Sequence, residues 1–187
     1  MKIDFSHFSV AARNVVAIAN EIKTLRGARG IDDIDLAVAI SVVETQGLNE
    51  LAKLDIGFSD LAKAIKINPL DITQKIGQTP VSVELQVPEL DEYKNFTPSG
   101  RFVMHWLSNL ACNTAIRNIQ NNQDSYPLGD PTDLVVRPEH ILFLALSNRT
   151  AAPSKLIEAA YHGVDLDPAK TLRERLGFKG CDITGSV

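Results

Sequence analysis

The sequence predicts an all-α fold, and three observations lead to this prediction. Apolar residues recur at helical spacing through most of the chain, whereas the alternation typical of strands occurs only at residues 81–87. Ser, Thr, Asp or Pro precedes several of the apolar stretches, as at the starts of capped helices. The same order of motifs also occurs twice along the chain, which indicates an internal repeat. We therefore expect about eight helices, arranged as two four-helix repeats.

The first half of the chain predicts four helices. Ser9 can cap a long helix that continues to Leu25. A second helix, from about residue 32 to 44, is apolar on most sides, which is typical of a central position in a bundle. Two shorter helices are expected at residues 48–54 and 59–69, where Pro69 marks the end of the second one.

The second half repeats this order after a connector with turn signals at Pro80 and Pro88. Four helices are expected near residues 97–120, 139–147, 152–161 and 167–176, with a polar loop between the first two. The organisation is thus a single domain of residues 1–187, with repeat one at 5–70, a linker at 71–95, repeat two at 96–176 and a tail at 177–187.

The core is expected to be built from aliphatic residues on the inner faces of the long and central helices. Each fully buried side chain of this type contributes about 1.5–3 kcal/mol before conformational entropy is subtracted. The predicted core residues are Val15, Ile18, Ile22, Leu36, Val38, Ile40, Val103, Leu107, Leu110, Leu142 and Leu146.

Composition excludes several classes of protein. A net charge of -4 without a basic stripe argues against nucleic-acid binding. No apolar run approaches the roughly 20 residues of a membrane helix, and the N-terminus lacks a secretory signal pattern. Two distant cysteines, Cys112 and Cys181, fit a reducing compartment, so a cytoplasmic location is expected.

Three pairs of motifs carry the repeat. Residues 8–13 align with 96–101, residues 31–36 with 136–141, and residues 54–59 with 162–167. The second half in particular, with Phe-Thr-Pro at 96–98, Pro-Glu-His-Ile at 138–141 and Gly-Val-Asp-Leu at 163–166, resembles the double-repeat N-terminal domain of the Clp family of protein unfoldases. The resemblance covers about residues 5–176 and implies two four-helix repeats with pseudo-twofold symmetry. It departs from the family at Ile34-Asp35, where the usual pair is Glu-His, and at the loop 121–134.

The resemblance implies a recognition surface. Its pseudo-twofold would place the two aromatic helix starts side by side, where an apolar groove accepts partner proteins or peptide-like ligands. Phe5, Phe8 and Phe96 are the candidate groove residues. The alternative is that these aromatic side chains pack on their own helices as hydrophobic staples.

Thr97 and Glu139 form a second candidate site. In Clp-C relatives the equivalent residues bind phosphorylated arginine, because a carboxylate pairs with the guanidinium while a hydroxyl and helix-start N–H groups hold the phosphate. The alternative is that Thr97 caps one helix and Glu139 sits in the first turn of another. The first half keeps Ser9 but has Ile34 in place of the carboxylate, so one of two such sites would be lost.

No catalytic or metal-ligating pattern emerges. The phosphate loop of the Clp ATPase modules, Gly-x-x-x-x-Gly-Lys-Ser/Thr, does not occur, and neither does a nucleophile elbow. Metal-ligand spacing of His is absent, and Asp32, Asp33 and Asp35 are expected to cap a helix. We expect a non-catalytic module without cofactor or metal that recognises Clp adaptors, substrates or Clp ATPase components. The alternatives are a stand-alone protein that sequesters peptide-like ligands or phosphoarginine, and an enzyme with an unrecognised site. The oligomeric state stays open.

Overall fold

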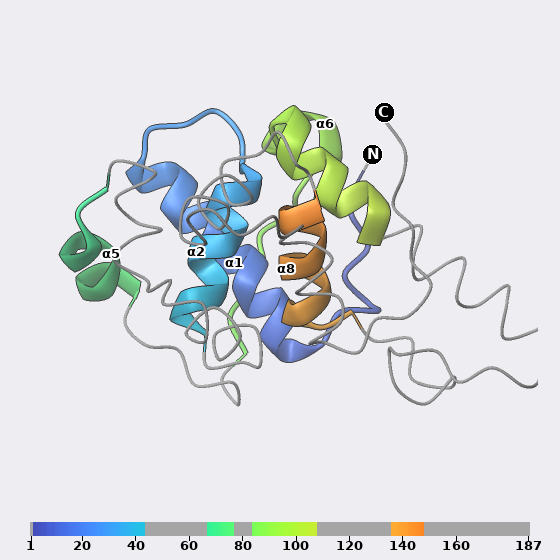
Figure 1. The fold of residues 1–187 in the computed structure, drawn as a ribbon, viewed down its shortest axis with the longest axis horizontal. Helices are drawn as coiled ribbons and strands as arrows, with labels where there is room; N and C mark the ends of the chain where they lie inside the picture. Colours follow the sequence, from blue (N-terminus) through green and yellow to red (C-terminus); the bar gives the residue numbers. More distant parts are fainter. Residues whose placement is uncertain (1, 44–66, 77–83, 108–135, 148–187) are drawn as a thin grey trace, which may run out of the picture.

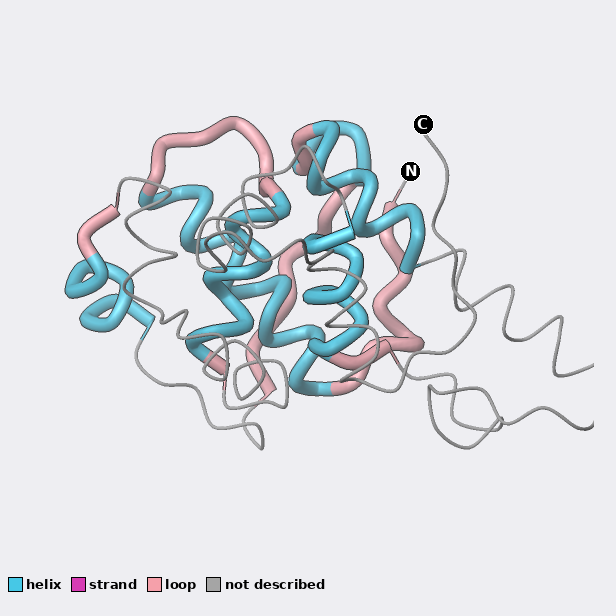
Figure 2. Tube along the Cα trace, viewed as in Figure 1, coloured by secondary structure: helices cyan, strands magenta, loops and turns pink. Residues whose placement is uncertain are grey.

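A computed structural model describes residues 2–43, 67–76, 84–107 and 136–147. The regular elements of these ranges are helices joined by loops, as Figure 2 shows. The all-α prediction is therefore confirmed for the described part of the chain. The predicted helices at 48–54, 152–161 and 167–176 lie outside the described residues.

Helix α1 (Val10–Leu25) is the long amphipathic helix that the sequence predicts. It ends in a Schellman motif, in which Gly27 N donates to Thr24 O (3.1 Å) and Ala28 N donates to Lys23 O (3.0 Å). Gly27 has φ 65°, a left-handed conformation that favours glycine. The turn sends the chain from the end of α1 back toward the start of α2.

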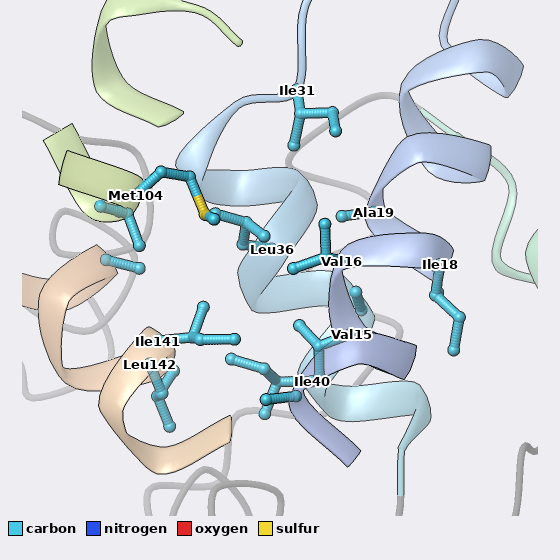
Figure 3. Packing of buried hydrophobic residues seen from close by; sticks show 14 of the residues in the cluster. Val15, Val16, Ile18, Ala19, Ile31, Leu36, Ile40, Met104, Ile141 and Leu142 are labelled. Atoms are coloured by element: carbon cyan, nitrogen blue, oxygen red, sulfur yellow. The ribbon is translucent and has the colours of Figure 1, made fainter. Parts of the chain in front are cut away.

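Helix α2 (Asp33–Val42) is the central helix, as its apolar circumference predicts. Nine of its ten residues are buried. It packs against α1 on one side and against α8 (Pro138–Ser147) on another. Figure 3 shows Leu36 and Ile40 of α2 between Ile141 of α8 and Val16 of α1. A further helical stretch at residues 98–107 adds Met104, whose side chain reaches Leu36 in Figure 3.

The hydrophobic core confirms the expectation from helical periodicity. Leu110 lies outside the described residues, as does the side chain of Leu146. The other predicted core residues are all 0% exposed: Val15, Ile18, Ile22, Leu36, Val38, Ile40, Val103, Leu107 and Leu142.

The connector predicted at residues 71–95 contains two helical segments. Helix α5 (Pro69–Ile76) starts where a helix was expected to end. Asn68 caps it, with its Oδ1 accepting from Leu70 N at 3.1 Å, and Pro69 occupies the first helical position, where its missing N–H is not needed. Helix α6 (Glu92–Asn95) is a single turn capped by Asp91. Pro69 thus starts a helix, and residues 59–66 of the helix expected before it lie outside the described residues.

The loop residues 84–90 bind to the first half of the chain. Leu85 N donates to Oδ1 of the buried Asn14 at 2.8 Å, and Arg13 Nη2 lies 3.0 Å from Glu84 Oε1. Ile3 N donates to Leu90 O at 3.1 Å. The segment expected as a linker is thus fastened along α1 and the N-terminal residues.

Candidate functional site

Two helices begin in the same way, with a hydroxyl side chain as N-cap. At α1, Ser9 Oγ accepts from Ala12 N at 3.1 Å, and Arg13 N donates to Ser9 O at 2.9 Å. At the helix of residues 98–107, Thr97 Oγ1 accepts from Gly100 N at 3.2 Å, and Arg101 N donates to Thr97 O at 2.8 Å. The alignment of residues 8–13 with 96–101 is thus matched bond for bond.

The residues before α1 pair with the residues before α8. Phe8 and Val136 form a parallel bridge. Ser9 N donates to Val136 O at 2.9 Å, and Val136 N donates to His7 O at 2.6 Å. We call the pairing of residues 7–9 with Val136 the first junction.

The same pairing occurs before α2 and before the helix of residues 98–107. Ile31 and Phe96 form a parallel bridge. Thr97 N donates to Ile31 O at 2.9 Å, and Ile31 N donates to Asn95 O at 2.7 Å. We call the pairing of residues 95–97 with Ile31 the second junction. In Figure 1, α1 and α8 begin in the lower part of the fold and α2 begins in the upper part, so the two junctions are separate.

Two glycines allow the close approach at the second junction. A Cβ on Gly30 would lie 2.8 Å from the backbone of Phe96 and Thr97, and a Cβ on Gly100 would overlap the carbonyl oxygen of Ile31. Real side chains do not tolerate such distances, so both positions need glycine for steric reasons.

The two central helices also share a cap arrangement, but with different side chains. At α2, Asp32 is the N-cap, and Oδ2 of Asp35 accepts from Asp32 N at 2.8 Å. At α8, Nδ1 of His140 accepts from Arg137 N at 3.0 Å. Asp35 and His140 occupy aligned positions, and each accepts a hydrogen bond from the backbone N–H three residues earlier. Both side chains are buried.

The second junction carries a buried acidic group. Arg26 Nη2 lies 2.6 Å from Asp35 Oδ2 and 4.0 Å from Asp32 Oδ2. Asp33 is 2% exposed; its Oδ1 accepts from Ile34 N, and its Oδ2 has no hydrogen-bond partner among the described residues. Burial, together with the adjacent Asp32 carboxylate, raises the pKa of Asp33 to about 8. Burial likewise raises the pKa of Asp35, although Arg26 opposes the rise.

The first junction carries a buried imidazole instead. His140 is 4% exposed. Burial, and then the positive charge of Arg137, lowers the pKa of His140 to about 4. Because Nδ1 accepts a hydrogen bond, the imidazole is neutral, with its proton on Nε2.

The three aromatic candidates have different environments. Phe8 and Phe96 are 5% and 4% exposed, so in this structure they offer almost no side-chain surface to a partner. Each belongs to a different junction and faces the central-helix start of the other half, not the other aromatic start. Phe5 is half-buried and packs edge-on against Phe8, with ring centroids 5.1 Å apart. The groove stays a prediction, and it rests on Phe5.

The other two candidates, Thr97 and Glu139, lie at different junctions. Thr97 caps its helix at the second junction, and its hydroxyl also lies 3.4 Å from Ile31 O. Glu139 is in the first turn of α8, next to the first junction. The first junction, beside Glu139, therefore carries the hydroxyl of Ser9 and not that of Thr97. Ile34 is the residue that corresponds to Glu139 at the junction of Thr97.

The sequence did not predict the long-range contacts of Arg26 and Asn14. Arg26 follows the last turn of α1 and reaches the caps of α2, while Asn14 is fully buried on α1. A polar residue within the apolar stretch of α1 was the available signal for Asn14. Within the described ranges, no group of three His, Cys, Asp or Glu side chains could hold a metal ion, and no helix is long and apolar enough to cross a membrane.

No protein-family model matches the chain. No curated protein matches its sequence either.

Proposed function

We propose that the chain is a non-catalytic protein-recognition module, built from two four-helix repeats with pseudo-twofold symmetry as in the N-terminal domain of Clp unfoldases. The observation that carries the proposal is the matched pair of junctions. If residues 8–13 are superposed on 96–101 and Ile31 on Val136, each backbone hydrogen bond of the first junction has its counterpart in the second. Matched bonds of this kind are expected from a repeated unit whose two copies complete each other.

The proposed contact surface is the N-terminal segment around Phe5. This aromatic residue keeps part of its surface accessible, while its neighbour Phe8 anchors the segment in the core. A partly exposed aromatic side chain that packs on a buried one suits the apolar anchors of another polypeptide. The partners are Clp adaptors, Clp substrates or Clp ATPase components.

A binding measurement tests this function. The full chain is titrated into a fluorescently labelled unfolded polypeptide and into a Clp adaptor protein, and anisotropy is recorded for wild type and Phe5→Ser. We expect a loss of affinity of roughly thirtyfold for Phe5→Ser, because one buried aromatic anchor contributes about 2 kcal/mol and each tenfold step corresponds to about 1.4 kcal/mol. His7→Ala is the matched control, because His7 is exposed on the same segment and its backbone bond to Val136 is retained.

Three results would speak against the proposal. Binding that is absent for wild type, or equal for Phe5→Ser and His7→Ala, removes the contact surface. Turnover in an ATPase or hydrolase screen that one polar substitution abolishes favours an enzyme. Tight binding of phosphoarginine without any affinity for polypeptides favours the ligand-sequestering alternative, and Ser9→Ala is then the substitution to examine, since Ser9 shares the junction of Glu139.

A further inference from the structure

The two junctions share their backbone bonds but differ in the ionisable side chains that stand beside them. The N-cap and first turn of α2 carry Asp32, Asp33 and Asp35, and the aligned positions at α8 are Arg137, Pro138 and His140. One junction therefore has buried acids and the other has a buried base. These groups respond to pH in opposite directions if their burial depends on the junction.

Asp33 is a buried residue directly beside the second junction. It follows Ile31 by two residues, and Ile31 is fixed by two backbone bonds to residues 95–97. Among the charged groups nearby, Arg26 is engaged with Asp35 and Asp32. From the other side of the junction, Arg101 lies over the Tyr93 ring, 5.3 Å from its centroid. No cation of the described residues therefore pairs with Asp33, and release of Ile31 would let water reach the carboxyl.

His140 is likewise a buried residue beside the first junction. Its Nδ1 accepts from Arg137 N, and Arg137 directly follows Val136, which is bound to residues 7–9. Arg13, near the start of α1, is paired with Glu84 at 3.0 Å. A protonated imidazole has no acceptor at Nδ1, so it would break the cap of α8 and would repel the neighbouring Arg137.

We propose that the two junctions form a pair of opposed pH-dependent latches, in which rising pH favours opening at Ile31–Phe96 and falling pH favours opening at Phe8–Val136. The inference concerns the fold and does not rest on the proposed function. Local opening of one junction frees the start of a central helix while the other junction stays closed.

Proton linkage sets the direction and the range of each response. Asp33 has a folded-state pKa of about 8, above its ordinary 3.8, so the closed second junction binds a proton that the open one releases. Opening there is favoured about tenfold per pH unit between these two values and is constant above the higher one. For His140 the folded-state pKa of about 4 lies below the ordinary 6.5, so opening of the first junction is disfavoured about tenfold per pH unit across that range and is constant above it.

Amide hydrogen exchange on the full chain tests the proposal, because each junction has its own pair of reporter amides. Ser9 N and Val136 N report the first junction, and Ile31 N and Thr97 N report the second. Protection factors, corrected for intrinsic chemistry, are measured from pH 5 to 8.5. We expect protection to fall about tenfold per pH unit at the second junction up to pH 8, and to rise at the first junction up to about pH 6.5.

Two matched variants separate the latches. Asp33→Asn keeps the acceptor for Ile34 N but cannot ionise, so it should flatten the response at Ile31 and Thr97 and leave Ser9 and Val136 unchanged. His140→Gln should do the reverse. Equal slopes at both junctions, or an Asp33→Asn variant with an unchanged slope at Ile31, would overturn the proposal. If either variant fails to fold, NMR titration of the wild type decides, by the carboxyl carbon for Asp33 and by the ring signals for His140. A side chain that titrates near its ordinary value excludes the latch at its junction.

Discussion

Gly100 lies directly against the carbonyl oxygen of Ile31, so that a side chain at this position would overlap it. The contact brings the first turn of one helix onto the residue that precedes another, and it lets Thr97 N reach Ile31 O at 2.9 Å. Gly100→Ala should therefore separate the second junction. We expect a loss of about 1–3 kcal/mol in the free energy of unfolding, as for other overpacked sites, measured by urea denaturation.

A surface substitution provides the control for Gly100→Ala. Gln86→Ala, at an exposed position, should change the free energy of unfolding by no more than about 0.5 kcal/mol. If Gly100→Ala lowers the free energy of unfolding no more than Gln86→Ala does, then Gly100 does not lie directly against Ile31.

The buried ion pair of Arg26 and Asp35 gives a second prediction. Arg26→Met leaves the fully buried Asp35 carboxylate without its cation, which should lower the free energy of unfolding by about 3 kcal/mol. Arg29→Met, at an exposed arginine nearby, is the control and should have little effect. In a double-mutant cycle, Asp35→Asn should recover part of the loss; additive effects would mean that the pair does not interact.

The helix caps give a third prediction, in which the two halves serve as each other's comparison. Ser9→Ala and Thr97→Ala should each cost about 1 kcal/mol, because each removes an acceptor for an N–H of the first helical turn. Thr97→Ser keeps the hydroxyl and should be close to neutral in thermal unfolding. A Thr97→Ser variant as unstable as Thr97→Ala would show that the methyl group, and not the cap, matters.

The attachment of residues 84–90 gives a fourth prediction. Asn14→Ala removes the acceptor of Leu85 N, and the loss of a buried hydrogen bond should lower stability by about 1–3 kcal/mol. The amide of Leu85 should then exchange faster in hydrogen-exchange measurements. Asn20→Ala, which removes only a bond to Lys23, is the control, and equal protection of Leu85 in both variants would contradict the assignment.

The pH dependence of global stability gives a fifth prediction. Because the pKa of Asp33 is raised to about 8, its contribution is fully present below its ordinary value and is lost as the pH rises toward 8. Between pH 5 and 7 this loss is about tenfold per pH unit in the equilibrium constant of unfolding. Asp33→Asn should therefore be more stable than wild type at pH 8, as measured by the midpoint of urea unfolding. A variant that is less stable at pH 8 would contradict the burial of a protonated acid.

The core and the long helices could be predicted from the sequence because burial follows helical periodicity. Val15, Ile18 and Ile22 recur on one face of α1, and their positions need no knowledge of any partner helix. The start of α5 was missed for a local reason. Proline occurs both just after helices and in their first turn, and here only the Asn68 cap shows that Pro69 starts a helix.

The pairing of the junctions could not be predicted from the sequence. The alignment found the repeated starts at Phe8 and Phe96, but it does not say whether each start meets its own copy or the other half's central helix. Tertiary contacts decide this. The same limit applies to Thr97 and Glu139, which the resemblance assigns to one candidate site but which lie at different junctions.

The reciprocal pairing has a consequence for the order in which the chain folds during synthesis. The start of α1 emerges from the ribosome early, yet its backbone partner Val136 is among the later residues, and Ile31 must likewise wait for Phe96. Neither of the early helices can finish its first turn with native partners until the later half has been translated. The first half of the nascent chain therefore needs the second half to complete these contacts. Until the second half has been translated, the first half exposes apolar surface.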